Sequence, residues 1–219
     1  MLSIRVDGVM PMSAAGTGGA PVRGAPVRFR AVRATPEQVV RAAAAWIAAG
    51  RRLDLQLLGA EQGISRATLH RKVGNRDNLL GLALAHRALD ALERAERDWE
   101  RGRRPHELRS LSVIMAFNAG VAADRGLRRL LDDEPMTAVR VLTDSRGHVQ
   151  PAVVTAFTRL LERDEQEGLL RQVVPFDQLA YAVVRLGESF LYADVIADRP
   201  PDVETANTLE RALVEAARR

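Results

Sequence analysis

Residues 54–77 show the pattern of two short helices joined by a tight turn. The first helix is predicted over 54–61, where three leucines supply an apolar face to bury. Gly63 follows it, and a residue with positive φ at that place ends a helix at low cost. Ser65 then stands where a hydroxyl is wanted to cap the second helix. This order of signals predicts a helix-turn-helix unit.

The second helix of this unit separates a buried edge from a cationic face. Leu69 and Val73 repeat at i, i+4 and are expected to point inward. The residues left outside are Arg66, Ala67, His70 and Arg71. A short helix of this composition also fits a merely solvated surface, so both interpretations stay open on composition alone. The cap, the glycine turn and the clustered cations together favour a helix that enters the major groove of DNA.

Residues 35–80 resemble the DNA-binding domain of the TetR family of bacterial repressors. The family pattern runs Thr-x-x-x-Ile-x-x-Ala-Ala, then a glycine-ended helix, then Ser-x-x-Thr-Leu-Tyr-x-Tyr-Phe-x-x-Lys-x-x-Leu. The corresponding residues are Thr35, Val39, Ala42, Ala43, Gly63, Ser65, Thr68, Leu69, His70, Lys72, Val73, Arg76 and Leu79. His70 and Lys72 stand where the family prefers tyrosine, and Val73 where it prefers phenylalanine. These departures bear on base preference rather than on DNA binding.

The residues expected to contact DNA follow from charge and from this resemblance. Arg66 and Arg71 are the candidates for base edges, with His70 as a weaker third. Thr68, Lys72 and Arg76 are the candidates for phosphate contacts. The predicted DNA-binding set is Ser65, Arg66, Ala67, Thr68, His70, Arg71, Lys72 and Arg76. The expected partner is a double-stranded, pseudo-palindromic operator with half-sites about 34–36 Å apart.

The charge distribution agrees with this location. Residues 1–33 carry five basic and one acidic group (net +4), and residues 34–80 carry seven and four (net +3). Residues 81–219 carry 20 basic and 23 acidic groups, a net charge of −3. The basic excess therefore lies in the N-terminal part, where contact with a phosphate backbone needs it. With no cysteine and no apolar run near the ~18 residues of a membrane span, a cytoplasmic protein without disulfides is expected.

The first 33 residues are predicted to be a disordered tail. Gly, Ala and Pro dominate 11–26, and no helical or strand period occurs there. Arg5 and Asp7 interrupt the only apolar stretch, which argues against a signal peptide. The tail arginines could add phosphate contacts, but an inert tail, or a start codon placed too early, is the preferred interpretation.

The rest of the chain predicts an all-α fold. Pro36 suits the first turn of a helix capped by Thr35, and a long helix starts near 77 or 78 and ends by 102. Further helices are predicted over 105–123, 124–132, 135–143, 148–167, 176–197 and 202–218, with turn signals between them. The predicted organisation is a tail (1–33), a three-helix helix-turn-helix domain (34–80), and a helical ligand-binding and dimerisation domain (81–219).

Two predicted helices carry candidate effector contacts. Residues 111–123 are apolar nearly all round, as in a buried helix, so Asn118 needs a partner, either a neighbouring helix or a ligand. In the helix 176–197 one stripe is polar, formed by Tyr181, Arg185, Glu188 and Tyr192. It is either a solvated face or the wall of a pocket between apolar side chains. The predicted effector-binding residues are Phe117, Asn118, Phe157, Tyr181, Arg185, Glu188 and Tyr192. Ala180 and Gly187, on another face, are assigned to dimer packing.

The C-terminal half is similar to the QsdR-type subgroup of the TetR family. The run 185–194 (Arg-Leu-Gly-Glu-Ser-Phe-Leu-Tyr-Ala-Asp) and the segment Pro200-Pro201-Asp202 carry the similarity, as do 68–71 and 73–77. The resemblance implies a homodimer built by the last two helices and a repressor that a small effector releases. In that subgroup the effectors are associated with lactones, including acyl-homoserine-lactone signals.

Features of an enzyme are weak. The four histidines, at 70, 86, 106 and 148, have no metal-ligand spacing. The run 187–189 lacks the final glycine of a nucleophile elbow and falls inside a predicted helix. The chain is therefore not expected to be an enzyme, and no metal or cofactor is predicted. The alternative to a DNA-binding regulator is a helical protein-interaction module with a degenerate helix-turn-helix, against which the basic excess of 34–80 argues.

Overall fold

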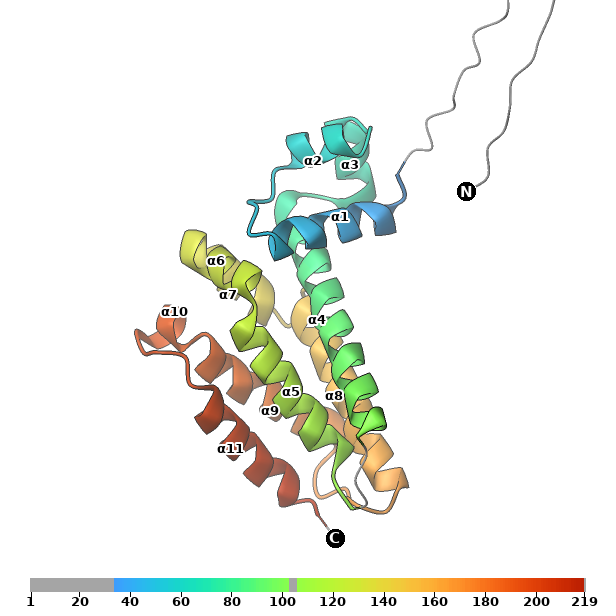
Figure 1. Cartoon of the computed structure of the whole chain (residues 1–219), viewed down its shortest axis with the longest axis vertical. Helices are drawn as coiled ribbons and strands as arrows, with labels where there is room; N and C mark the ends of the chain where they lie inside the picture. Colours follow the sequence, from blue (N-terminus) through green and yellow to red (C-terminus); the bar gives the residue numbers. More distant parts are fainter. Residues whose placement is uncertain (1–33, 103–105, 219) are drawn as a thin grey trace, which may run out of the picture. The chain divides into compact units, whose positions relative to one another are not determined.

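The structure, a computed structural model, describes residues 34–102 and 106–218. Within these residues the chain forms eleven helices and no strand beyond one isolated bridge between Leu170 and Arg218 (Figure 1). The helices are α1 (Pro36–Ala48), α2 (Leu55–Glu61), α3 (Arg66–Val73), α4 (Arg76–Arg101), α5 (Arg109–Ala123), α6 (Arg125–Asp133), α7 (Pro135–Thr143), α8 (Val149–Gln166), α9 (Phe176–Leu191), α10 (Ala193–Ala197) and α11 (Val203–Glu215). The predicted all-α class is confirmed. The predicted tail, 1–33, lies outside the described residues.

Helices α1, α2 and α3 begin and turn where their local sequence signals stand. Thr35 and Gln38 form a reciprocal capping box at the start of α1. The Asp54 carboxylate caps α2, and the Ser65 hydroxyl accepts from the N–H of Thr68 at the start of α3. Gly63, in the turn between α2 and α3, has a φ of 64°. The predicted helix-turn-helix is therefore present.

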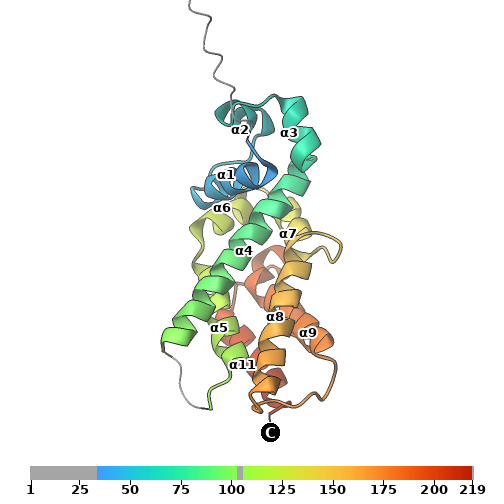
Figure 2. The ribbon, with the colours of Figure 1, turned by 90° about the vertical axis from the view of Figure 1, so that its right-hand side faces the viewer.

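Helix α4 joins these three helices to the others without a break. It runs for 26 residues from an Asn75 cap, about 39 Å at the usual helical rise, and continues straight through the predicted domain boundary at residue 80. Figure 2 shows α1 lying across its upper part and α8 running alongside its lower part. One rigid element thus touches both the helix-turn-helix and the rest of the bundle.

The predicted helix 105–123 begins later, at Arg109, because its cap comes from a distant residue. The buried Asp164, on α8, accepts hydrogen bonds from the N–H groups of Arg109 (3.0 Å) and Ser110 (2.9 Å) and from the Ser110 hydroxyl (2.5 Å). These bonds satisfy donors that a helix start leaves free. The prediction that α5 is buried all round is wrong: Ala116, Ala119 and other small residues form an exposed side.

The predicted helix 176–197 is two helices. Tyr192 leaves helical geometry, with φ −115° and ψ 23°, so α9 ends at Leu191 and the short α10 follows. The phenol of Tyr192 is buried at this break. The periodicity of side chains continues across the break, which is why the sequence pattern does not reveal it.

Two contacts fix α6 and α7 against the helix-turn-helix. Glu134, between α6 and α7, pairs with Arg76 (2.6 Å) at the start of α4 and with Arg52 (3.1 Å) in the loop before α2. Burial opposes ionisation of Glu134, but the two arginines outweigh it and hold the pKa of that carboxyl below its usual range. Gly126, in the first turn of α6, lies against the end of α1.

We expect Gly126→Ala to push α6 away from α1 and lower the melting temperature. A Cβ at this position would lie 2.2 Å from the carbonyl oxygen of Ile47 and 2.9 Å from the Cα of Ala48, both backbone atoms that cannot rotate aside. Overpacking of this kind costs about 1–3 kcal/mol. Gly120→Ala is the matched control: a Cβ there meets nothing within 4 Å, and helix propensity should stabilise it by about 0.5–1 kcal/mol. Equal melting curves for the two variants would contradict the close approach.

Candidate DNA-binding surface and effector cavity

Helix α3 buries one edge and exposes its cations. Leu69 is fully buried and Val73 nearly so, as predicted. Ser65, at the cap, is exposed, and so are four residues of α3, namely Arg66, Ala67, His70 and Arg71, whereas Thr68 and Lys72 are half-buried. Within the described residues, the side chains of Arg66, His70 and Lys72 make no hydrogen bond or ion pair. These side chains are therefore available to an external partner.

Arg76 does not share this freedom. Its Nε donates to the carbonyl oxygen of Leu53 (2.8 Å), and its guanidinium pairs with Glu134. Only 26% of its side chain is exposed. The prediction of Arg76 as a phosphate contact is therefore not supported: the start of α4 uses this arginine to hold the loop before α2 and the α6–α7 junction.

A cavity of about 210 Å³ lies among the helices that follow α3. Its walls come from α4, α5, α8 and α9, with single residues from α6, α7 and α11. Among its apolar lining residues are Leu84, Phe117, Val153, Phe157, Val184 and Leu191. The rings of Phe117 and Phe157 meet edge to face, with centroids 5.8 Å apart. Its exposed lining residues are Arg94 and Gly120, so its mouth lies between α4 and α5.

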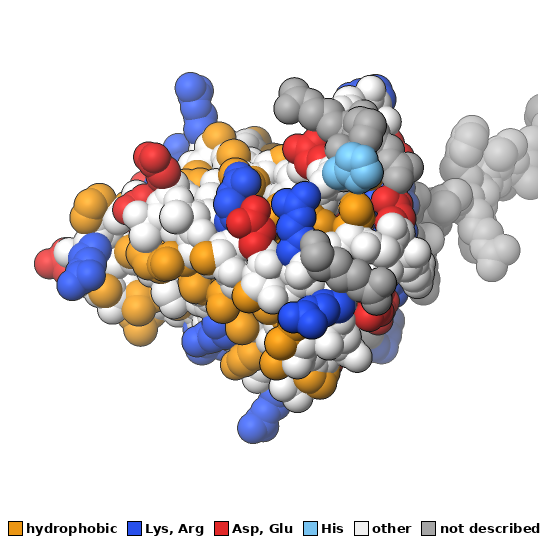
Figure 3. All heavy atoms as spheres, turned by 90° about the horizontal axis from the view of Figure 1, so that it is seen from below, with side chains coloured by type: hydrophobic (Ala, Val, Ile, Leu, Met, Phe, Trp, Pro, Cys, Tyr) orange, Lys and Arg blue, Asp and Glu red, His pale blue; other side chains and the backbone are white. Residues whose placement is uncertain are grey.

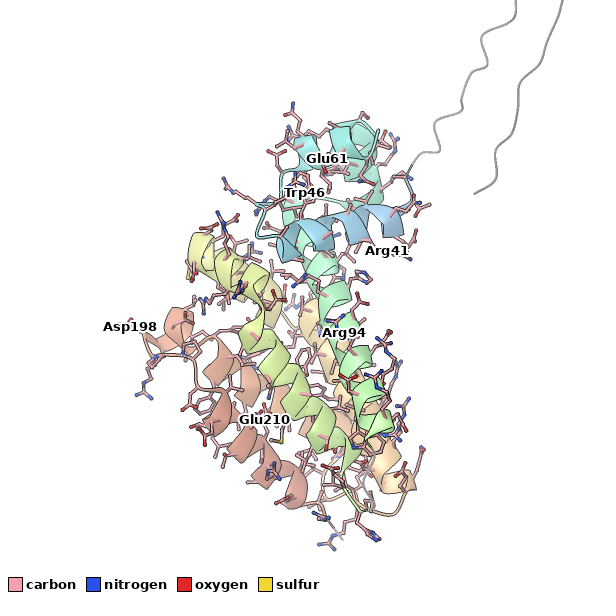
Figure 4. All side chains as sticks on the ribbon, in the orientation of Figure 1. Arg41, Trp46, Glu61, Arg94, Asp198 and Glu210 are labelled. Carbon is pink, nitrogen blue, oxygen red and sulfur yellow. The ribbon has the colours of Figure 1, made fainter. Side chains whose placement is uncertain are left out.

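The inner end of the cavity carries buried polar groups. Glu188 accepts from the amide nitrogen of Gln150 at 3.1 Å to each oxygen and from Arg185 at 2.7 Å. Glu210, 1% exposed, accepts one hydrogen bond, 2.7 Å long, from the amide nitrogen of Asn118. Figure 4 shows Glu210 on α11 and Arg94 on α4, with α5 between these helices in that view. The cavity therefore leads from a mouth with a cation to a floor with two carboxyl groups.

Burial shifts the acidity of these floor groups. It raises the pKa of Glu210 to about 7, with Asn118 the only group that partly offsets the shift. Burial also raises the pKa of Glu188, although Gln150 and Arg185 counteract it. The pKa of the Tyr192 phenol is raised by burial and by the nearby Glu188 carboxylate.

The structure brings together five of the seven predicted effector residues. Phe117, Asn118, Phe157, Glu188 and Tyr192 all line the cavity. Asn118 satisfies both open interpretations, since it also donates to Asn207 and Glu210 of α11.

Tyr181 and Arg185 do not line the cavity, so the pocket-wall interpretation of the stripe is wrong for these two residues. Tyr181 is 48% exposed, and the Arg185 side chain is 47% exposed. The four residues stay within about 60° of one another around the helix, but Tyr181 and Arg185, nearer its start, are exposed, whereas Glu188 is buried. Arg185 contacts Glu188 from the outer side.

Ala180 and Gly187 are buried within the chain, which corrects their assignment to dimer packing. A Cβ on Gly187 would lie 2.7 Å from the Oε1 atom of Glu210. The glycine is needed so that the Glu210 carboxyl of α11 can lie against α9. The face assigned to a partner molecule is thus filled by the chain's own last helix.

The sequence interpretation missed Glu210, Gln150 and Arg94 as lining residues. A signal for Glu210 was present: Ala206, Glu210 and Val214 repeat at i, i+4 and are all buried. A carboxylate in the middle of a buried helical stripe needs a partner or a function. Gln150 and Arg94 carry no such pattern, because both are set by how α8 and α4 converge.

The comparisons with known proteins bear on this arrangement. Residues 107–215 match the family described as "Tetracyclin repressor-like, C-terminal domain". The solved structure of the R. erythropolis transcriptional repressor QsdR, from the TetR family, is 27% identical with a TM-score of 0.74, over 84% of this chain and 96% of that one. The chain belongs to the TetR family. It is a DNA-binding helical regulator of this family, as predicted.

A more distant solved structure agrees in fold. A protein described as a TetR-family transcriptional regulator from Rhodococcus sp. is 16% identical to this TetR-family chain, with a TM-score of 0.50, over 84% of this chain and 98% of that one. No curated protein sequence matches the chain. None of the described helices is both long and apolar enough to cross a membrane.

We expect Glu210→Gln to stabilise this TetR-family protein at pH 8 much more than at pH 5. A carboxyl whose pKa rises from 4.5 to about 7 on folding costs no stability below pH 4.5, and the cost grows until the pH passes 7. The full difference corresponds to roughly 3 kcal/mol, and less than about 1 kcal/mol is present at pH 5. Thermal unfolding at both pH values measures it. A stabilisation independent of pH would show that Glu210 is not a titrating buried carboxyl.

Proposed function

We propose that this TetR-family protein is a transcriptional repressor that binds a pseudo-palindromic operator as a homodimer and is released by a small effector. The observation that carries the proposal is the exposed cationic face of α3 beside its buried Leu69 and Val73. The solved relative that the chain resembles at 27% identity is described as a repressor, which supports this direction of control. We assign DNA binding to residues 34–80, and effector binding and dimerisation to residues 81–219, with α4 shared between the two domains. In this proposal the protein is cytoplasmic and acts by binding rather than by catalysis.

The roles proposed for α3 follow from exposure and side-chain chemistry. Arg66 and Arg71 are exposed and can donate two hydrogen bonds each to a guanine edge. Lys72, half-buried at the side of the helix, suits a phosphate. Thr68 accepts from the Ser65 hydroxyl and from Arg71 (3.4 Å), which orients that arginine. His70 completes the face as a further donor.

Operator binding by point variants tests these roles. Arg71→Ala should lose about 1–3 kcal/mol of operator binding and relax the base preference at one position, because a guanine contact is lost. Lys72→Ala should weaken binding to all sequences alike and flatten the salt dependence by about one ion. Fluorescence anisotropy with DNA from beside the protein's own gene, at two or more salt concentrations, measures both effects.

The control for these variants is Arg159→Ala, which removes an exposed arginine from α8, away from α3. It should bind the operator as the wild type does. If Arg71→Ala and Lys72→Ala also bind like the wild type, α3 is not the reading helix. Affinity that does not change with salt would instead favour a protein-interaction module.

The proposed dimer surface is the outer side of α9 and α11. On α11, exposed apolar or small residues repeat at i, i+3, i+4 and i+7: Leu209, Ala212, Leu213 and Ala216. Tyr181 and Ala182 of α9 are exposed as well. Seen from below, hydrophobic side chains gather at the surface on the left of the view, the side where Figure 1 draws α10 and α11 (Figure 3). An apolar face of two adjacent helices is suited to an isologous contact with a second copy.

Charge on this surface should produce monomers. Leu209→Arg and Leu213→Arg place cations on a face that a second copy would bury, and both leucines are already about 40% exposed, at 41% and 38%, so folding is preserved. Val173→Arg, at an exposed valine in the loop before α9, is the matched control and should stay dimeric. Light scattering after size exclusion gives the mass of each. A monomeric wild type at micromolar concentration would contradict the dimer.

Release by an effector is supported by contacts that lead from the cavity to the reader. Arg87 lines the cavity, pairs with Asp124 at the start of α6 and donates to the carbonyl oxygen of Ala44 on α1 (3.4 Å). Gly126 then packs α6 on the end of α1. A ligand that moves α4 or Arg87 would therefore change the position of α1 and α3. Since the operator fixes the distance between the two α3 helices of a dimer, a small tilt of these helices weakens operator binding.

The effector itself is tested by release. The similarity to QsdR-type regulators brings lactones into the proposal as one ligand class. A gel shift with operator DNA and a lactone series shows whether any member dissociates the complex. Release requires that the ligand bind the DNA-free conformation more tightly than the DNA-bound one.

A further inference from the structure

The floor of the cavity has more hydrogen-bond acceptors than donors. The Gln150 amide nitrogen lies 3.1 Å from each oxygen of Glu188, so one of its hydrogens is shared between the two. Both hydrogens of the Asn118 amide are directed at Asn207 and Glu210. Both Asn118 hydrogens are therefore used within the protein, and Gln150 retains one.

Acceptors remain without a donor. Within the described residues, Oε1 of Glu210 accepts no hydrogen bond, and neither does the Asn118 carbonyl oxygen. Both oxygens lie near Gly187 of α9. A Cβ built on this glycine would be 2.7 Å from Glu210 Oε1 and 3.9 Å from Asn118 Oδ1. Asn118 is 3% exposed and Glu210 1% exposed, and both line the cavity.

Tyr192 adds a third unpartnered group. Its phenol is 93% buried (7% exposed), lines the cavity, and makes no hydrogen bond to any described residue. Its hydroxyl can supply one donor at most. This hydroxyl and the second Gln150 hydrogen are few donors beside the lone pairs of the Glu210 carboxylate and the Asn118 oxygen, so a ligand that brings hydrogen-bond donors fits the floor.

The charge balance of the floor points the same way. Arg185 pairs with Glu188 from the outer side of α9, but among the described residues no cation pairs with Glu210. A buried carboxylate without a cation is costly, and a charge-assisted hydrogen bond from a ligand would remove much of that cost.

We propose that the cavity binds an amphipathic organic cation, an ammonium group on a small apolar body, with the ammonium at Glu210. The proposal rests on the proposed function, since it takes this cavity to be the effector site. An ammonium carries three donors and no acceptor, which matches the floor. The apolar walls accept the hydrocarbon body, and a cavity of about 210 Å³ limits it to one short chain or a single ring.

Two other ligand classes fit the floor less well. A lactone ring has only acceptor oxygens, so it would bring no hydrogen to the Glu210 carboxylate. A divalent metal ion would need more ligands: within residues 34–102 and 106–218, no three histidine, cysteine or carboxylate side chains come together at a metal-binding distance. The apolar walls also offer no coordinating atoms to a metal ion.

Isothermal titration of the full-length protein with n-octylamine tests the proposal. The neutral probes are n-octanol and γ-octalactone, which have the same number of carbons. We expect octylamine to bind at least about tenfold more tightly than either neutral probe. Glu210→Gln should lose about tenfold or more of the octylamine affinity and little of the octanol affinity, because only the cation uses the carboxylate.

The control variant is Glu204→Gln, on the exposed side of the same helix and outside the cavity lining. It should bind octylamine and operator DNA like the wild type. Thermal unfolding of Glu210→Gln establishes that the variant is folded, and its retained octanol affinity is a second check. Equal or tighter binding of the lactone or the alcohol to the wild type would overturn the proposal, as would full octylamine affinity in Glu210→Gln.

Operator release separates this proposal from the proposed function. If octylamine binds through Glu210 but leaves the operator complex intact, the ligand class stands and effector-controlled release fails. If γ-octalactone releases the operator and octylamine does not bind, effector-controlled release is supported and the proposal of a cationic ligand is overturned. Absence of binding by all three probes overturns the cation as well.

Discussion

Helix α4 is a single unbroken helix of 26 residues that packs both against the helix-turn-helix and against the helices around the cavity. The other described helices are positioned by their contacts with it or with the helices that it touches. Its first turn holds Arg76, which ties the loop before α2 to Glu134. Its middle supplies Leu84, Arg87 and Arg94 to the cavity. In the effector release proposed above, α4 would carry a displacement of the cavity wall to its other end, because backbone hydrogen bonds make a helix stiff. The close packing of Gly126 against α1 leaves little slack beside it.

The buried polar groups between α5, α9 and α11 form a second constraint. Asn118, Glu210 and Asn207 connect α5 to α11, and the absence of a side chain at Gly187 allows α9 to approach Glu210. A purely apolar contact at this place would be easier to stabilise, since burial raises the pKa of Glu210 to about 7. Retaining a carboxyl that destabilises the empty fold at neutral pH is understandable if a bound donor uses it. The same feature that costs stability is thus the basis for ligand recognition.

The DNA-binding face and the cavity differ in how much of each is determined by residues close together in the sequence. The DNA-binding face depends on residues within one short helix, and caps at Ser65 and the turn at Gly63 determine its orientation. Exposure of Arg66 and Arg71 then follows from burial of Leu69 alone. The cavity instead needs side chains from seven helices, and its members lie far apart in the chain. Helical periodicity placed Glu188 and Tyr192 in a stripe with Tyr181 and Arg185, although only the first two face inward.

The sequence by itself determined the all-α class, most helix starts, the helix-turn-helix and its cationic face, because caps, glycine turns and i, i+4 spacing act over a few residues. Only the tertiary structure decided that Arg76 is engaged by Glu134, that Gly187 faces the chain's own α11, and that α9 ends at Tyr192. It also decided that Glu210 lies at the floor of the cavity. Each of these depends on which helix packs against which, and the direction of approach between helices distant in sequence is not encoded in the periodicity of either one.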